Sequence, residues 1–189
     1  MSEGLVLLVL RVVVGIVFVA HGGNHIWGGG RIAGTARWFD SLGMRPGILH
    51  AWTASVTELA AGALLVAGLM TPIAAAGVVG VMLVAWVTNH RKNGFFIFRP
   101  GEGYEYVLTL TACGVAIAGL GAGPISLDHV LGIWDPPGWW GLLWAGLGML
   151  GAVFLLVTFW RPGPVPSATA GPRPTARPDP EQSDGGGIS

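Results

Sequence analysis

A chain of 189 residues in which 52% are hydrophobic and only 11% are charged differs from soluble globular domains, where about 25% of residues are charged. Its ten basic and ten acidic residues cancel, which argues against nucleic acid as a partner, because nucleic-acid-binding proteins carry a strongly basic surface. The single cysteine, Cys113, excludes a disulfide or a cysteine metal cluster within one chain. The composition therefore predicts an integral membrane protein.

Five apolar segments are long enough to cross a bilayer, which requires about 20 residues in a helix. They comprise residues 5–26, 48–70, 72–89, 104–120 and 139–160. The first segment lacks the basic start of a cleaved signal peptide and contains Arg11, so we expect it to remain as a span. Pro72 follows the second segment almost directly, which predicts a tight antiparallel hairpin. The expected fold class is an all-α polytopic membrane helix bundle.

The basic residues divide the connections into two groups, and this division predicts the topology. After the first, third and fifth spans come Arg31, Arg37, Arg45, Arg91, Lys92, Arg99, Arg161, Arg173 and Arg177. The other connections contain no lysine or arginine. Because basic loops stay in the cytoplasm, we expect the N-terminus outside and the C-terminus inside. The expected location is the bacterial cytoplasmic (inner) membrane, with the lipid bilayer as the surrounding partner.

Two charged residues lie within the predicted spans, where an unpaired charge costs several kcal/mol. At 1.5 Å per residue, Arg11 lies about 9 Å from the outer end of its span and Glu58 about 15 Å from the inner end of its own. In a core about 30 Å thick their heights differ by about 6 Å, so Arg11 and Glu58 are predicted to face each other. Such a pair either only fixes the packing or forms the polar centre of a proton or quinone site.

Four histidines lie near the predicted cytoplasmic ends of the first three spans. His21 and His25 end the first span, His50 begins the second and His90 ends the third. Three interpretations remain open: solvation at the interface, ligation of haem or another metal, and proton transfer beside a quinone, since histidine titrates near neutral pH. No HExxH or paired-cysteine motif accompanies them. Quinone is therefore the leading cofactor candidate, haem is a weaker one, and no metal site is assigned.

Several short motifs, taken in order, resemble the DoxX family of small bacterial membrane proteins. They read "GIVFVAHG", "GTARWFDSLGM", "ELAAGALLVAGLMTPIAA", "HRKNGFF", "GYEYVLTLTACGVAIAGLG" and "SLDHVLG". The resemblance covers residues 10–132 and implies a DoxX-like four-helix core over residues 1–132. Residues 133–160 would add a fifth transmembrane helix. Residues 161–189 are rich in proline and glycine, so we expect a disordered cytoplasmic tail.

The resemblance also implies redox chemistry at the quinone pool, with soluble or membrane oxidoreductases as partners. Together with the charge pattern, it selects the candidate site residues. The candidate catalytic residues are His21, Glu58 and His90, and the candidate ligand-binding residues are Arg11, Gly22, His25, Asn93, Gly94 and Glu105. In the family a lysine commonly stands at the position that His25 occupies here, which implies a pH-dependent role.

The leading hypothesis is a quinone-linked redox subunit or accessory protein of a membrane oxidoreductase. Glu58 and Arg11 would form its buried centre. Protons would pass through His21, His25 and His90 to the cytoplasmic side. The alternative is a non-catalytic membrane adaptor for partner proteins, whose polar residues only hold the bundle together. Transport of a small solute is less favoured, because no inverted repeat or broken helix is evident.

Overall fold

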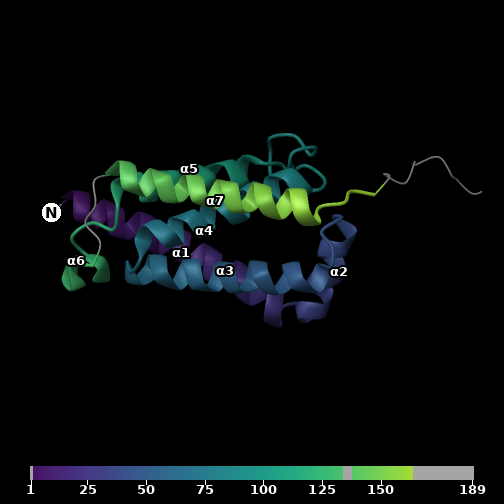
Figure 1. The fold of residues 1–189 in the computed structure, drawn as a ribbon, viewed down its shortest axis with the longest axis horizontal. Helices are drawn as coiled ribbons and strands as arrows, with labels where there is room; N and C mark the ends of the chain where they lie inside the picture. The colour runs from purple at the N-terminus through teal and green to yellow at the C-terminus, as the bar shows by residue number, and fades with distance from the viewer. Residues whose placement is uncertain (1, 134–137, 164–189) are drawn as a thin grey trace, which may run out of the picture.

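The computed structural model describes residues 2–133 and 138–163, and within these ranges the chain is helical, without a β-strand. The elements are α1 (Ser2–Trp27), α2 (Arg31–Ser41), α3 (Gly47–Ala67), α4 (Thr71–Ala85), the π-helical turn η1 (Trp86–His90), α5 (Glu105–Leu120), α6 (Leu127–Leu131) and α7 (Gly138–Phe159). The long helices α1, α3, α4, α5 and α7 lie side by side along the molecule, with α2 at one end and α6 at the other (Figure 1). These ends are called the α2 end and the α6 end below.

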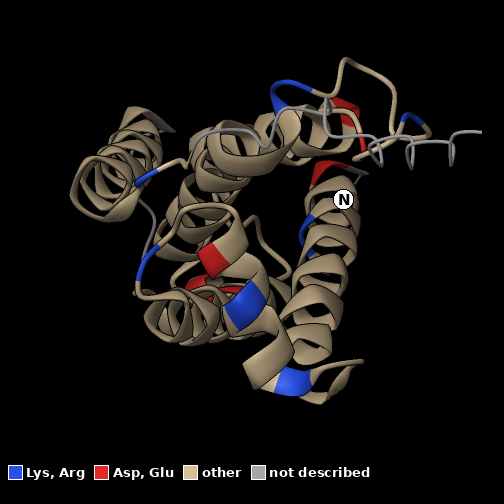
Figure 2. Ribbon diagram, turned by 90° about the vertical axis from the view of Figure 1, so that its right-hand side faces the viewer, with Lys and Arg blue, Asp and Glu red and all other residues tan. Residues whose placement is uncertain are grey.

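The long helices have the length and composition of membrane spans. Among the described residues four helices qualify, namely Glu3–Trp27, Gly47–Ala67, Thr71–His90 and Trp139–Phe159, and α5 is a shorter apolar helix of 16 residues. Large apolar side chains such as Val6, Leu150 and Phe154 are exposed on the outside of the bundle. Acidic and basic residues occupy only a few positions along the ribbon (Figure 2). The predicted all-α membrane bundle is confirmed.

Glycines allow α1 and α3 to approach closely. A Cβ atom on Gly15 would lie 2.7 Å from the carbonyl oxygen of Gly62, and one on Gly62 would lie 2.6 Å from that of Gly15. Two turns beyond, a Cβ on Gly22 would lie 2.9 Å from the carbonyl oxygen of Ser55. Small residues at such contacts let backbones pack tightly in lipid, where the hydrophobic effect does not drive association. The glycine contacts therefore set the register of α1 against α3.

The predicted hairpin between the second and third spans is present. Gly68 ends α3 with φ = 66°, Met70 has φ = 48°, and Pro72 lies in the first turn of α4. The Asp128 carboxylate, from α6, accepts hydrogen bonds from the backbone N–H groups of Met70 (2.7 Å) and Thr71 (2.9 Å). It thereby caps the first turn of α4, whose N–H groups have no partner within the helix.

The prediction that Arg11 faces Glu58 is wrong. Arg11 is fully buried at the α6 end, where Nη1 donates to the carbonyl oxygen of Leu65 at 2.9 Å and Nη2 donates to that of Ile125. Leu65 lies seven residues beyond Glu58, about 10 Å along α3. The depths predicted from the sequence assume that the first and second spans begin and end at the same heights in the membrane. The glycine register instead displaces Arg11 toward the end of α3, near the carboxylate of Asp128.

Helix α7 packs against α4 and α5 through further small residues. The backbone of Ala118 leaves no room for a Cβ on Gly141, and the backbone of Ala76 leaves none on Gly148. Past its end, the Trp160 indole N–H donates to the Leu42 carbonyl oxygen at 3.0 Å, which ties α7 to the loop before α3. Residues 164–189, which make up most of the predicted disordered tail, lie outside the described residues. The division into a core of residues 1–132, a fifth helix over residues 133–160 and a tail stays a prediction.

Candidate functional site

A cavity of about 560 Å³ lies on α4, between α3 and α7, and extends to α1 and α2 at the α2 end of the bundle. Most of its lining is apolar. The titratable or amide side chains that line it are His21, His25, His50, Glu58, Asn89, His90, Glu102 and Tyr106. A largely apolar cavity with a few converging polar groups is the usual form of a small-molecule site.

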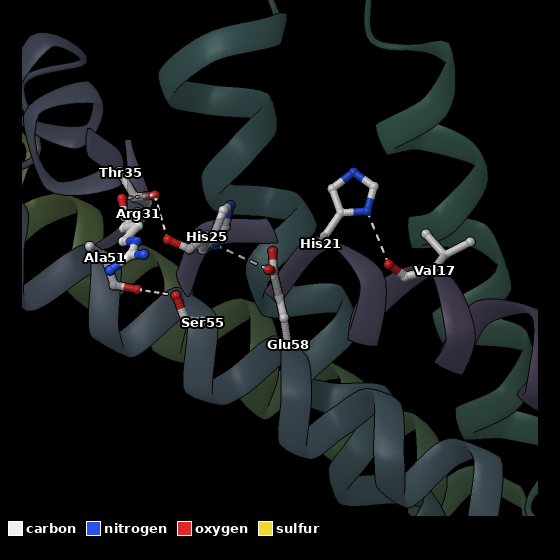
Figure 3. A network of polar contacts seen from close by, with 8 residues as sticks. All are labelled: Val17, His21, His25, Arg31, Thr35, Ala51, Ser55 and Glu58. Carbon is white, nitrogen blue, oxygen red and sulfur yellow. Dashed lines mark hydrogen bonds and ion pairs between the residues drawn. The ribbon is translucent and has the colours of Figure 1, made fainter. Parts of the chain in front are cut away.

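The central contact in the cavity joins His25 of α1 to Glu58 of α3. Nδ1 of His25 lies 3.3 Å from Oε2 of Glu58, and Figure 3 shows the two side chains pointing toward each other. The contact has ion-pair distance but not the alignment of a hydrogen bond, so neither atom has a hydrogen-bond partner within the described residues. One proton can serve the pair, carried by either the imidazole or the carboxyl group. The close approach at Gly22 brings the two helices together here.

His50 places a third polar atom without a hydrogen-bond partner in the cavity. The residue is only 3% exposed, its ring packs edge-on against Phe159 at 5.1 Å and tilted against Phe39 at 6.2 Å, and its Nε2 has no hydrogen-bond partner among the described residues. Glu58, two turns further along α3, is 6% exposed. An unsatisfied buried polar group costs about 1–3 kcal/mol. Three such atoms in one cavity favour a ligand that satisfies them.

His21 lies beside this pair but makes different contacts. Its Nδ1 lies 3.0 Å from the carbonyl oxygen of Val17 on the same helix, as Figure 3 shows. Its ring stacks on Tyr106 of α5, with the ring centres 5.7 Å apart. Both residues line the cavity. His21 therefore lies where the polar part of the cavity meets α5.

The loop after η1 closes against the α2 end of the cavity. The Nδ1 atom of His90 lies 2.9 Å from the carbonyl oxygen of Glu102, and both residues line the cavity. The side-chain amide of Asn93 donates to the carbonyl oxygens of Asn89 (3.1 Å) and Glu102 (3.2 Å). Gly94, with φ = 79°, accepts a hydrogen bond from a backbone N–H further along the loop. Asn93 and Gly94 therefore shape this loop rather than the cavity wall.

The structure brings together some of the predicted site residues and separates others. His21, His25, Glu58 and His90 line one cavity; Arg11, Gly22, Asn93, Gly94 and Glu105 are not among its lining residues. Arg11 holds the opposite end of the bundle, Gly22 is a helix contact, and Glu105 begins α5.

His50 lines the cavity but is not among the site residues predicted from the sequence, although the sequence places it at the same end of the membrane as the other histidines. The available signal was its spacing of eight residues from Glu58, which places the two residues within about 80° of each other around α3. The cavity also includes Asn89, which belongs to a π-helical turn. Such turns often occur at functional sites, and no sequence pattern used above predicts them.

Comparison with known families bears on residues that include the polar end of this cavity. The DoxX family model matches residues 6–91. The match confirms the predicted resemblance and covers a little less than half of the chain. The DoxX match contains the four histidines and Glu58, and it ends before Asn93, Gly94 and Glu105; the resemblance over residues 92–132 stays a prediction. No curated protein matches the chain, and no solved structure does.

Proposed function

We propose that this DoxX-type integral membrane protein is a quinone-linked redox subunit or accessory protein, and that its cavity holds the quinone ring. The observation that carries the proposal is the set of three buried atoms without a hydrogen-bond partner among the described residues in one largely apolar cavity, namely Nδ1 of His25, Oε2 of Glu58 and Nε2 of His50. A second protein, an oxidoreductase, is proposed as the electron donor or acceptor.

The residues of the cavity fit a quinone ring by their chemistry. The ring is flat and apolar, with two oxygen atoms that accept hydrogen bonds, and bound quinone supplies two-electron chemistry coupled to two protons. Trp38 and Phe39 give the cavity aromatic walls. Because the other ring nitrogen of His50 contacts the backbone of Arg45, Nε2 can donate a hydrogen bond when the imidazole is protonated, and the His25–Glu58 pair can donate its shared proton. These three side chains are proposed to hold the ring.

Proton exchange is proposed to occur at the α2 end. Glu58 and His25 are proposed to hold one proton inside the cavity, and His90, the last residue of η1 and a lining residue of the same cavity, is proposed to pass it outward. Histidine is suited to this step because it gains and loses a proton near neutral pH. His21 lines the same cavity and offers a second route. The side of the membrane would be the cytoplasmic one if the basic residues at this end stay inside.

The test replaces Glu58 by Gln, which keeps the size of the side chain but removes its ability to hold the shared proton. The chain is purified in mild detergent, and its reduced-minus-oxidised absorbance spectrum is recorded together with the quinone extracted from it. We expect a quinone signal in the wild-type protein and a several-fold lower quinone content in Glu58→Gln. The matched control is Glu105→Gln, because this glutamate does not line the cavity.

Two results would decide against the proposal. Wild-type protein that retains no quinone and binds none when it is added would leave the cavity without its proposed ligand. A Glu58→Gln protein that binds and reacts normally, with changes only in stability or in the recovery of partner proteins, would instead support the non-catalytic adaptor. Haem bands in the visible spectrum would assign the histidines to a metal cofactor.

A further inference from the structure

The cavity continues well beyond its polar end. Along α4 and η1 its lining runs from Ile73 to His90, which corresponds to about 25 Å of helix. His25, His50 and His90 line it toward the α2 end and Glu58 lines it near the middle of α3, while Ile73, Trp144 and Leu147 line it toward the α6 end. The space therefore resembles a slot whose polar part reaches from the α2 end to the middle of α3 and whose remaining length toward the α6 end is apolar.

Small residues keep the slot open. Its floor is α4, which lies between α3 and α7 in the view of Figure 1, and Gly77 and Gly80 lie on this floor. The contact of Gly80 with the backbone of Gly148 sets the spacing between α4 and α7. One turn further along α7, a Cβ on Gly151 would meet no atom within 4 Å, although Gly151 lines the cavity. A side chain added at Gly151 would therefore enter open space at an exposed side of the cavity.

We propose that the apolar length of this slot holds the isoprenoid tail of the quinone whose ring occupies the polar end, an inference that rests on the proposed function. The polar part contains three buried atoms that lack hydrogen-bond partners among the described residues, and the apolar part is continuous with it. A ligand with a polar ring and a long apolar tail satisfies both parts at once. A ligand without a tail would leave the slot to lipid chains.

The tail would select and orient the ligand through shape. In lipid an apolar tail gains little from the hydrophobic effect on entering a protein groove, so the benefit comes from packing against the walls. A slot open along α4 fixes the direction of the tail. The fixed direction of the tail therefore also fixes the orientation in which the ring faces Glu58 and His50.

The test is photo-crosslinking of the full chain in lipid nanodiscs. The probe is a dimethoxybenzoquinone with a ten-carbon tail that ends in a diazirine. We expect the crosslinks to map to the segments around Ile73 and Trp144, and to disappear when an excess of the same quinone without the diazirine is added. Gly151→Leu fills the slot, and we expect it to reduce this labelling about tenfold, since overfilling a packed site costs about 1–3 kcal/mol.

The matched control is Gly146→Leu, which lies on the same helix, also in open space, but outside this cavity. We expect Gly146→Leu to be labelled as strongly as the wild-type protein. Binding of a tailless dimethoxybenzoquinone, measured separately, should be equal in the wild-type protein and both variants, because this probe needs only the polar end.

The outcomes separate the tail from the ring. If the tailless quinone binds and depends on Glu58, but the diazirine labels lipid-facing surfaces evenly, the tail lies in bulk lipid and the slot proposal is overturned while the function stands. If a phospholipid competes for the slot as well as the quinone does, the slot is a lipid site and the proposal is also overturned. If neither quinone binds, both proposals fall.

Discussion

The contact between His25 and Glu58 brings two titratable groups together at a depth where charge is expensive. The two side chains share one proton. Removing one of them leaves the other buried without its partner, whereas removing both leaves no unpaired titratable group. We expect His25→Leu and Glu58→Leu each to lower the free energy of unfolding by about 3 kcal/mol. The double variant should lose less than the sum of the two. The measurement is thermal unfolding in one detergent across the double-mutant cycle.

Strict additivity in this cycle would mean that the two side chains do not interact. The 3.3 Å contact would then contribute nothing to the free energy of unfolding. A double variant that recovers stability but holds no quinone would be consistent with a pair that serves ligand binding rather than folding.

His50 permits a separate test of whether an unpaired group is kept for a ligand. Nε2 of His50 gains nothing from the described residues, so His50→Phe removes an unsatisfied atom while keeping a ring against Phe39 and Phe159. We expect the ligand-free protein to lose no more than about 1 kcal/mol of stability, while its quinone content falls several-fold. Thermal unfolding and quinone extraction on the same preparations check both. A large loss of stability with unchanged quinone content would show a purely structural histidine.

At the scale of elements, the α6 segment acts as a clamp on the turn between α3 and α4. Asp128 accepts hydrogen bonds from two backbone N–H groups at the start of α4. Asparagine would offer only one acceptor oxygen in its place. We expect Asp128→Asn to lower the free energy of unfolding by about 1–2 kcal/mol. Chemical unfolding in detergent measures this loss. An unchanged stability would mean that water or the chain itself replaces the lost acceptor.

The contact between α1 and α3 should be the least tolerant of added volume. A Cβ on Gly62 would lie 2.6 Å from the Gly15 carbonyl oxygen, which is backbone and cannot move aside. We expect Gly62→Ala to cost at least about 2 kcal/mol and to lower quinone content, because α1 carries His25. Gly146→Ala, which meets nothing within 4 Å, is the matched control and should retain wild-type stability and quinone.

Sequence patterns located the long helices because apolar length is a strong signal, and they located the turn at Pro72. They missed α2, a short amphipathic helix within a polar, glycine-rich connection, whose Phe39 packs beneath α3. They also placed Arg11 wrongly, because the register of α1 against α3 depends on backbone contacts between glycines. Composition shows that such glycines exist but not which two of them touch.

For the whole molecule, the topology is a prediction that one labelling experiment decides. The α2 end carries most of the basic residues and the α6 end carries none outside the spans, so we expect α2 in the cytoplasm. In a Cys113→Ala background, Ser41→Cys should react with a membrane-impermeant maleimide only after the cells are permeabilised. Val130→Cys, on the exposed face of α6, should react in intact cells. The reverse pattern would invert the topology and the side of proton exchange.

A stretch of close-packed apolar side chains divides the two polar positions of α1. Arg11 at the α6 end and His25 in the cavity are separated by Val14 and Phe18, each only 2% exposed and packed in the core. No described polar side chain bridges this stretch of α1, and water finds no partners among close-packed apolar groups. The slot extends along α4 to Ile73, but its part toward the α6 end is apolar and also offers water few partners. We therefore expect protons exchanged at the polar part of the cavity to equilibrate with the compartment at the α2 end. Under the proposed redox function, this arrangement would let the protein exchange protons at one side of the membrane without letting protons cross it along the electrochemical gradient.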